Sequence, residues 1–251
     1  MTAPRLLIIQ PDQTDPIGPL GDWLIDAGAE LDIRLPSTSS LPDDLDGYQG
    51  LVCLGGGMSA NDDLAHPWLV PVRRLLNTAV LQTLPTLGIC LGAQLLAIAA
   101  GGQVEKGEHG PEVGASLVAK KDAAWTDPLF AELPLMPDVL HFHEDAITRL
   151  PGNAVLLASA PRYPNQAFRI GRCGYGIQFH IETTVEVVQA WAKDVPDMMS
   201  AAKPGAFEAA TLAQVHTDLA ETWQPFAARF VQLAAGAVLP AAANPRHLPL
   251  T

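Results

Sequence analysis

Apolar residues in the first hundred positions fall into two alternating patterns. Short continuous runs have the length and composition of buried strands, and they cover residues 5–10, 31–35, 50–54 and 86–90. Stretches with apolar residues at three- and four-residue spacing predict helices at 17–30, 68–82 and 91–100. Strands and helices that alternate in this way form a doubly wound, mostly parallel sheet. Because such sheets bind ligands at the carboxyl ends of their strands, we expect a functional site at the turns after residues 54 and 90.

The pattern changes after about residue 112. Five apolar segments follow in close succession, with no room for helices between most of them: EVGASLVAK, DVLHFHED, NAVLLASA, QAFRIG and CGYGIQFH. We expect antiparallel strands here, added to the sheet or packed beside it. Thr183 and Glu186 then have the spacing of a capping box, which predicts that a helix begins there and continues to about Lys193.

The C-terminal part of the chain is predicted to be helical. After a turn-rich stretch at 196–205, apolar residues recur every three or four positions through 206–236. They include Leu212, Val215, Leu219, Trp223, Phe226 and Phe230. We therefore expect a domain over residues 1–195 and a helical extension over 196–251 that packs on it, with a frayed end at 242–251.

Composition and charge narrow the classes of function. The 251 residues are 48% hydrophobic and 17% charged, which is typical of a soluble globular protein with one sizeable core. The formal net charge of −12 argues against a nucleic-acid partner. The apolar stretch near the N-terminus is too short for a signal peptide, and no segment approaches a membrane span. We expect a cytoplasmic protein without a membrane partner.

Three cysteines, Cys53, Cys90 and Cys173, occur without any C-x-x-C spacing. Free thiols in a reducing compartment are the simplest interpretation. Cys53 belongs to the core of a predicted strand. Cys173 lies in an R-C-G turn that could be exposed, and nothing near it in the sequence would activate it. Cys90 differs from both because a predicted strand turns into a predicted helix at this residue.

The segment Gly88-Ile89-Cys90-Leu91-Gly92 has the form G-x-C-x-G, a nucleophile elbow with cysteine in place of serine. A sharp turn strains the backbone at the nucleophile, and the glycines let neighbouring segments approach closely. The N-terminus of the following helix favours the thiolate, and the amide of Leu91 can form half of an oxyanion hole. The alternative is a small buried hydrophobic side chain, the ordinary role of a free cysteine.

A thiol nucleophile normally works with an oriented histidine. His180 ends the apolar strand GYGIQF, and Glu182 follows two residues later, on the same side of an extended chain. A glutamate there can fix the tautomer of the imidazole; the alternative is a surface pair at the end of a strand. Gln94 lies one helical turn after Cys90, so its amide can reach back toward the thiol. Its partner is then a bound substrate or, alternatively, a loop.

His141 and His143 form a second constellation, H-F-H-E-D. Both side chains would share one face of a strand, a spacing that zinc can use. No third and fourth ligand is obvious nearby, and the number of ligands is the first requirement of a metal site. We therefore expect no metal here and favour a wall of the substrate pocket or a strand edge.

Together, GICLGAQ, GIQFHIE and the triglycine turn LGGG resemble the class I glutamine amidotransferase family, the triad glutaminases. The order Cys…His-x-Glu is similar to that family, and residues 51–195 resemble its stand-alone, GMP-synthase-like members. The resemblance implies an α/β, flavodoxin-like fold: a doubly wound, mostly parallel sheet with added antiparallel strands. A helical C-terminal extension would complete it.

The resemblance also implies a set of catalytic roles. Cys90 would attack the side-chain amide of glutamine and form a γ-glutamyl thioester. His180 would act as base toward the thiol and as acid toward the departing ammonia, and Glu182 would orient His180. The amides of Gly57 and Leu91 would form the oxyanion hole, and water would release glutamate.

For the substrate, the resemblance implies that Gln94 contacts the α-substituents of glutamine, and we expect His143 in the wall of the same pocket. No cofactor and no metal are expected. The chain departs from the family pattern at two positions: Ile181 stands where the family usually has proline after the histidine, and Met58 replaces the proline of a G-G-P turn.

Three functions are compatible with these residues. The first is a glutaminase whose ammonia passes to a separate synthetase, because no G-x-x-x-x-G-K-[ST] loop occurs in the chain. The second is a hydrolase of another γ-glutamyl amide. The third is a triad-bearing regulatory or scaffold subunit without activity of its own.

Overall fold

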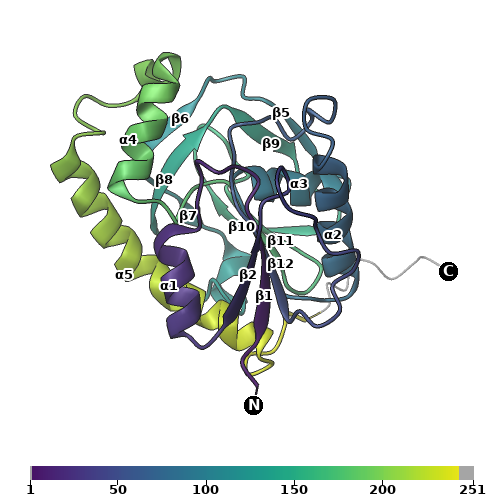
Figure 1. The fold of residues 1–251 in the computed structure, drawn as a ribbon. Helices are drawn as coiled ribbons and strands as arrows, with labels where there is room; N and C mark the ends of the chain where they lie inside the picture. Colours follow the sequence, from purple (N-terminus) through teal and green to yellow (C-terminus); the bar gives the residue numbers. More distant parts are fainter. Residues whose placement is uncertain (1, 243–251) are drawn as a thin grey trace.

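The computed structural model of the chain describes residues 2–242, and a mixed eight-stranded sheet forms its centre (Figure 1). The strand order is β2-β1-β3-β4-β12-β11-β10-β7. The strands are β1 (Arg5–Ile9), β2 (Glu30–Arg34), β3 (Gly50–Cys53), β4 (Thr86–Ile89), β7 (Ala119–Lys120), β10 (Ala154–Ser159), β11 (Ala167–Ile170) and β12 (Gly174–Ile177). The pairings among the first five strands in the order are parallel, and those from β12 to β7 are antiparallel. The predicted α/β fold with a mostly parallel sheet is confirmed.

Strand β12, the last strand along the chain, differs from the expectation. We expected the segment CGYGIQFH to be antiparallel to its neighbours, and this is correct only for its pairing with β11. On its other side β12 pairs in parallel with β4, with Ile177 opposite Ile89. The reason is that the tight turn between β11 and β12 reverses the chain and brings β12 into the direction of the parallel half.

Two short antiparallel pairs lie outside the main sheet. β5 (Gln103–Lys106) pairs with β9 (Asp145–Arg149), and β6 (Glu112–Leu117) pairs with β8 (Asp138–His143). A single bridge between Leu140 and His180 connects β8 to the segment that follows β12. These pairs therefore lie next to the end of the sheet where the parallel strands finish.

Helices cover both faces of the sheet. Figure 1 shows α1 (Gly18–Asp26) and α5 (Ala209–Ala234) on one side and α2 (Leu69–Leu81) and α3 (Leu91–Ala99) on the other. The alternation along β1 explains the two layers: Leu6 and Ile8 belong to the cluster that contains the α1 and α5 side chains, whereas Leu7 and Ile9 belong to the cluster of α2 and α3. No helix within residues 2–242 is long and apolar enough to cross a membrane.

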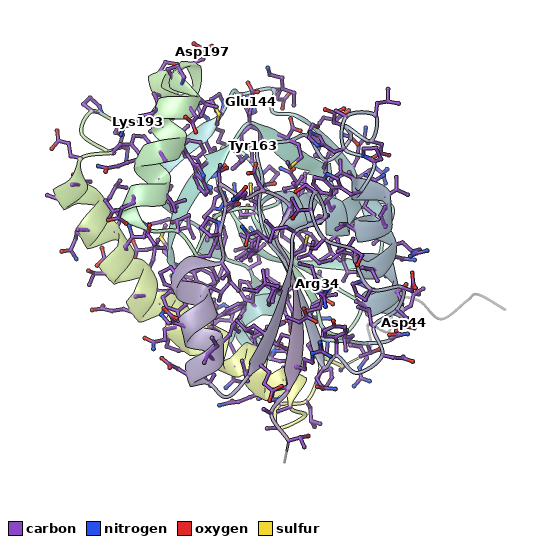
Figure 2. The ribbon with its side chains drawn as sticks, viewed as in Figure 1. Arg34, Asp44, Glu144, Tyr163, Lys193 and Asp197 are labelled. Atoms are coloured by element: carbon purple, nitrogen blue, oxygen red, sulfur yellow. The ribbon has the colours of Figure 1, made fainter. Side chains whose placement is uncertain are left out.

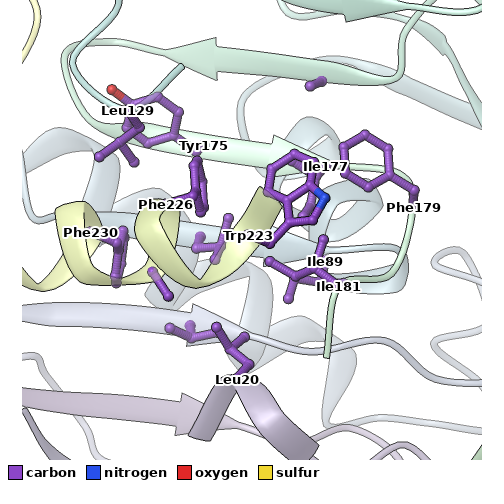
Figure 3. Close-up of a cluster of buried hydrophobic side chains, with 14 of the residues drawn as sticks. Leu20, Ile89, Leu129, Tyr175, Ile177, Phe179, Ile181, Trp223, Phe226 and Phe230 are labelled. Carbon is purple, nitrogen blue, oxygen red and sulfur yellow. The ribbon is translucent and has the colours of Figure 1, made fainter. Parts of the chain in front are cut away.

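Helix α5 contributes its apolar stripe to the main core. Trp223, Phe226 and Phe230 are almost completely buried and pack beside Tyr175 and Ile177 of β12 (Figure 3). The indole of Trp223 also donates a hydrogen bond to the carbonyl of Asp138 at 2.8 Å. The part of the extension after residue 242, including nearly all of the end expected to be frayed, lies outside the described residues.

Helix α4 (Val185–Asp194) begins one residue later than the capping-box spacing predicts. Its N-cap is Thr184, whose hydroxyl accepts a hydrogen bond from the amide of Val187 at 3.3 Å. Thr183 is not the cap because its hydroxyl is 3.0 Å from Nε2 of His216 on α5. The turn-rich stretch after α4 contains a short 3₁₀ helix (Pro196–Ala201), and a second one (Asp122–Thr126) follows β7.

Candidate active site

The segments that follow the parallel strands meet at one edge of the sheet. Asp15 follows β1, Gly57 follows β3, Cys90 follows β4 and His180 follows β12. All four residues line one cavity, together with Trp191 of α4. The expected position of the site, at the carboxyl ends of the strands, is therefore the position of a cavity in the structure.

Cys90 stands at a strained turn between β4 and α3. Its backbone has φ +49° and ψ −107°, a conformation that side-chain-bearing residues rarely adopt. Two glycines make the turn possible. A Cβ at Gly92 would overlap the carbonyl oxygen of Cys53, and a Cβ at Gly88 would lie 2.6 Å from the backbone of Gly92. The thiol is 6% exposed and lies at the N-terminus of α3, where the helix dipole favours a negative charge.

His180 and Glu182 form a buried pair. Nδ1 of His180 is 2.6 Å from Oε1 of Glu182, and the two side chains are 3% and 0% exposed. The amide of His180 donates to the carbonyl of Leu140 at 2.8 Å, which anchors the histidine to β8. The amide of Ile181 donates to Oε2 of Glu182 at 2.8 Å. A proline has no such N–H, so the departure from the family pattern adds a bond to the glutamate.

The environment of His180 favours its protonated form. Burial acts to lower the pKa of this imidazole, but the Glu182 carboxylate and the neighbouring Cys90 sulfur outweigh it and raise the pKa well above its ordinary value. The ring of Trp191 packs over the imidazole at a centroid distance of 4.9 Å. His180 thus lies between a carboxylate and a sulfur atom and is covered by an aromatic ring.

Asp15 is a further carboxyl group at this site, and the sequence analysis did not identify it. It is 2% exposed, and its Oδ1 has no hydrogen-bond partner within residues 2–242. Burial raises the pKa of Asp15 well above its ordinary value, and the charge of Glu182 raises this pKa further. This environment therefore favours the neutral form of the carboxyl beside Glu182. Its position after β1, at the same sheet edge, is the signal that could have identified it.

The two expected oxyanion-hole amides differ in their present partners. The amide of Gly57 donates to Oδ2 of Asp12 at 3.2 Å, so it already faces a carboxylate oxygen. Burial acts to raise the pKa of Asp12, but hydrogen bonds from Thr14 and Gly57 outweigh it and lower the pKa. Leu91 is the first residue of α3, where the backbone N–H has no acceptor within the helix.

Gln94 and His143 hold the same carbonyl oxygen. Nε2 of Gln94 donates to the carbonyl of Asp145 at 3.0 Å, and Nδ1 of His143 is 2.9 Å from that oxygen. Both side chains are buried, yet they line a second cavity that also reaches Cys90. Their contact with substrate stays a prediction. Gln178, which was not identified from the sequence, connects Gln94 to the thiol: its Oε1 accepts from Nε2 of Gln94 at 3.4 Å, and its Nε2 is 3.8 Å from Sγ of Cys90.

Among residues 2–242, two groups of buried residues have ligand atoms close enough to hold a metal ion. One is Asp15, His180 and Glu182, in which the imidazole is already hydrogen-bonded to Glu182. The other is Glu112, His141 and His143, on β6 and β8. The sequence analysis missed Glu112 because it is 31 residues from His143 in the chain.

The other two thiols are free and lie in protein interior. Cys53 is fully buried in β3, and burial raises the pKa of its thiol. Cys173 is 1% exposed, so the expectation of an exposed turn is wrong. Its Sγ donates to the carbonyl of Thr83 at 3.1 Å, and burial raises the pKa of this thiol to about 11. Both environments disfavour a reactive thiolate.

Comparison with known proteins identifies the family. The model of the family described as glutamine amidotransferase class-I matches residues 22–190, more than half of the chain. The chain belongs to the class I glutamine amidotransferase family. The glutamine-hydrolyzing GMP synthase of Christiangramia forsetii is 37% identical to this chain over 144 residues, which are 57% of this chain and 26% of that protein. The chain therefore spans about a quarter of that relative.

A second relative and a solved structure extend the comparison. Gamma-glutamyl peptidase 4 of Arabidopsis thaliana is 30% identical over 147 residues, which are 58% of each protein. The crystal structure of a glutamine amidotransferase from Thermotoga maritima matches this chain with a TM-score of 0.80 and 26% identity. The match covers 93% of this chain and 99% of the other, so nearly the whole fold is shared.

Proposed function

We propose that this protein hydrolyses the side-chain amide of glutamine through a thioester on Cys90. The observation that carries the proposal is the shared cavity of Cys90 and His180, with His180 held by Glu182 at 2.6 Å. A thiol on a strained backbone turn at a helix N-terminus, beside an oriented imidazole, is the arrangement that nucleophilic catalysis requires.

The proposed reaction has two steps. His180 takes the proton of the Cys90 thiol, the thiolate sulfur attacks the side-chain carbonyl carbon, and the C–N bond breaks as the imidazolium of His180 gives that proton to the departing nitrogen, which leaves as ammonia. Water then attacks the thioester, His180 takes a proton from it, and the thiolate leaves as glutamate is released. Glu182 keeps Nδ1 of the imidazole paired, so that the other ring nitrogen is the one that exchanges protons.

The negative oxygen of each tetrahedral intermediate needs hydrogen-bond donors. We assign this role to the amides of Leu91 and Gly57. Because the amide of Gly57 already binds the carboxylate of Asp12, the substrate oxygen must replace that carboxylate. Gln94 and His143 fix the carbonyl of Asp145 and thereby the wall of the second cavity, where we place the α-amino and α-carboxyl groups of glutamine.

The ammonia is proposed to pass to a separate synthetase. The GMP synthase of C. forsetii supports this proposal because the chain matches only 26% of it. In this proposal residues 1–195 carry the hydrolysis, and residues 196–251 form an extension that packs on them. The three free thiols favour a reducing compartment such as the cytoplasm.

A second candidate is hydrolysis of another γ-glutamyl amide, and the similarity to a gamma-glutamyl peptidase supports it. The same thiol, imidazole and carboxylate would perform both reactions. They differ in the leaving group, which is ammonia in the first case and a larger amine in the second.

The deciding experiment measures glutamate release by the purified protein from glutamine and from a panel of γ-glutamyl amides. Ammonia released in equal amount from glutamine supports the glutaminase, whereas turnover of the panel alone supports the second candidate. The matched controls are Cys90→Ala, which is expected to be inactive, and Cys173→Ala, which keeps the reacting groups. Inactivity of the wild-type protein toward every substrate, together with stable binding of another protein, would favour the regulatory subunit.

A further inference from the structure

A buried group outside the proposed triad combines one carboxylate with two imidazoles. In the β6–β8 pair Glu112 is directly opposite His143, and His141 lies two residues before His143 on the same face. Oε2 of Glu112 is 3.0 Å from Nε2 of His143 and 3.8 Å from Nδ1 of His141. All three side chains are at most 10% exposed. Figure 2 labels Tyr163, whose ring lies beside that of His143.

The hydrogen atoms of this group do not balance without a cation. A carbonyl oxygen only accepts, so Nδ1 of His143 carries a hydrogen toward the carbonyl of Asp145 at 2.9 Å. In the neutral imidazole Nε2 is then an acceptor, and it faces an oxygen of Glu112 that is also an acceptor when ionised. Two acceptors 3.0 Å apart need a positive charge between them, either a proton or a metal ion.

The environment of His141 favours a metal ion over a proton as this positive charge. Both of its ring nitrogens are buried, and neither has a hydrogen-bond partner within residues 2–242. A neutral imidazole carries a lone pair on one ring nitrogen and a hydrogen on the other, so this ring has an unused acceptor beside Glu112. A proton between His143 and Glu112 would leave this buried imidazole without a partner, which costs free energy. A metal ion would bind all three side chains at once.

We propose that Glu112, His141 and His143 bind one divalent transition-metal ion, for which zinc is the best probe. Zinc bound at about 2.1 Å in a tetrahedral site keeps its ligand atoms roughly 3.4 Å apart, between the 3.0 Å and 3.8 Å found here. Two imidazoles and a carboxylate suit zinc, and water can take the fourth position.

The residues around the three ligands have the hydrogen bonds of a metal site. Ligand histidines usually donate their second ring N–H to a carbonyl or carboxylate, and ligand carboxylates accept further bonds. His143 makes the first contact, to Asp145, and Gln166 makes the second by donating to Oε2 of Glu112 at 2.8 Å. Glu112 and His141 also line a surface cavity, which gives an ion a path from solvent.

A metal ion in this place would stabilise the wall of the second cavity. It would connect β6 to β8 and fix His143, whose other nitrogen holds the carbonyl of Asp145. The inference does not depend on the proposed hydrolysis, because Cys90 and His180 are outside the ligand group.

The test measures zinc in the purified full chain after chelator treatment, incubation with zinc and desalting. We expect about one zinc ion per chain in the wild-type protein and in Cys90→Ala. Glu112→Gln and His141→Ala are expected to bind zinc at least tenfold more weakly, as measured against a competing chelator. His109→Ala, which changes a half-exposed histidine, is the matched control and is expected to bind as the wild type does.

Three results would overturn the inference: less than a tenth of an equivalent of zinc in the wild-type protein, unchanged binding in both ligand variants, or loss of zinc in Cys90→Ala. Circular dichroism checks that the variants are folded. If neither ligand variant folds, X-ray absorption of the zinc-loaded wild type decides. Nitrogen and oxygen ligands with two imidazoles support the site, and a sulfur ligand contradicts it.

Discussion

Replacing Glu182 by glutamine changes the triad while keeping its volume. The carboxylate is 0% exposed and accepts two hydrogen bonds, from His180 at 2.6 Å and from the amide of Ile181 at 2.8 Å. Glutamine has one acceptor oxygen in place of two and carries no charge. Because the Glu182 charge raises the pKa of His180, Glu182→Gln is expected to lower that pKa and to reduce the population of the imidazolium.

The size of the effect follows from the role of the carboxylate. A catalytic triad that loses its orienting carboxylate slows by about 10⁴-fold in kcat. Removing one partner of a buried, hydrogen-bonded charge pair separately costs about 3–5 kcal/mol of folding stability, so circular dichroism must show that the variant is folded. Because Glu182 contacts the imidazole and no substrate atom in the proposed mechanism, kcat should fall and KM should change little.

The assay measures initial rates of glutamate release for the wild type, Glu182→Gln and the control Glu186→Gln. Glu186 is an exposed residue of α4, four positions further along the chain, so the control makes the same chemical change away from the cavity. We expect the control to release glutamate at the wild-type rate and Glu182→Gln to release it at least 100-fold more slowly. A fall of less than tenfold in a folded Glu182→Gln protein would show that the buried pair does not orient the base.

Three further predictions concern stability, measured by urea unfolding. Gly92→Ala places a methyl group against a backbone carbonyl and should cost about 3 kcal/mol, whereas Gly152→Ala, with open space around it, should be nearly neutral. Trp223→Ala should lower the free energy of unfolding by about 3–5 kcal/mol because the indole is fully buried. Trp125→Ala should lower it far less, because that indole is half-exposed. The folded state raises the pKa of Asp15, so the stability that this carboxyl contributes is present below pH 3.8 and should be lost as pH rises above it, and Asp15→Asn should remove that part of the pH dependence.

Local patterns allowed the main sheet to be predicted from the sequence. The runs at 5–10, 50–54 and 86–90 are apolar at every or nearly every position because each strand is covered on both faces. The parallel pairing of β12 with β4 could not be predicted, because the direction of a strand relative to a distant neighbour depends on the turn before it. The same holds for the N-cap of α4, where Thr183 is engaged by a histidine of α5.

The residues of the site likewise include some that local sequence patterns reveal and some that only the fold brings in. The elbow at Cys90 and the i, i+2 pair of His180 and Glu182 are local arrangements, so their residue types and spacing are visible in the chain. Asp15 and Glu112 are brought in by other strands, and only the fold places them beside these histidines. The burial of Cys173 depends on the carbonyl of Thr83, 90 residues away in the chain.

The activated thiol is tested most directly by covalent labelling. The intact protein is treated with a glutamine analogue that carries an electrophile at the side-chain carbon, and the modified peptides are identified by mass spectrometry. Cys90 is expected to carry the label, with glutamine protecting it, because Cys53 and Cys173 are buried away from the cavity. Label found mainly on Cys53 or Cys173, or equal labelling of Cys90 with and without glutamine, would contradict the proposed nucleophile.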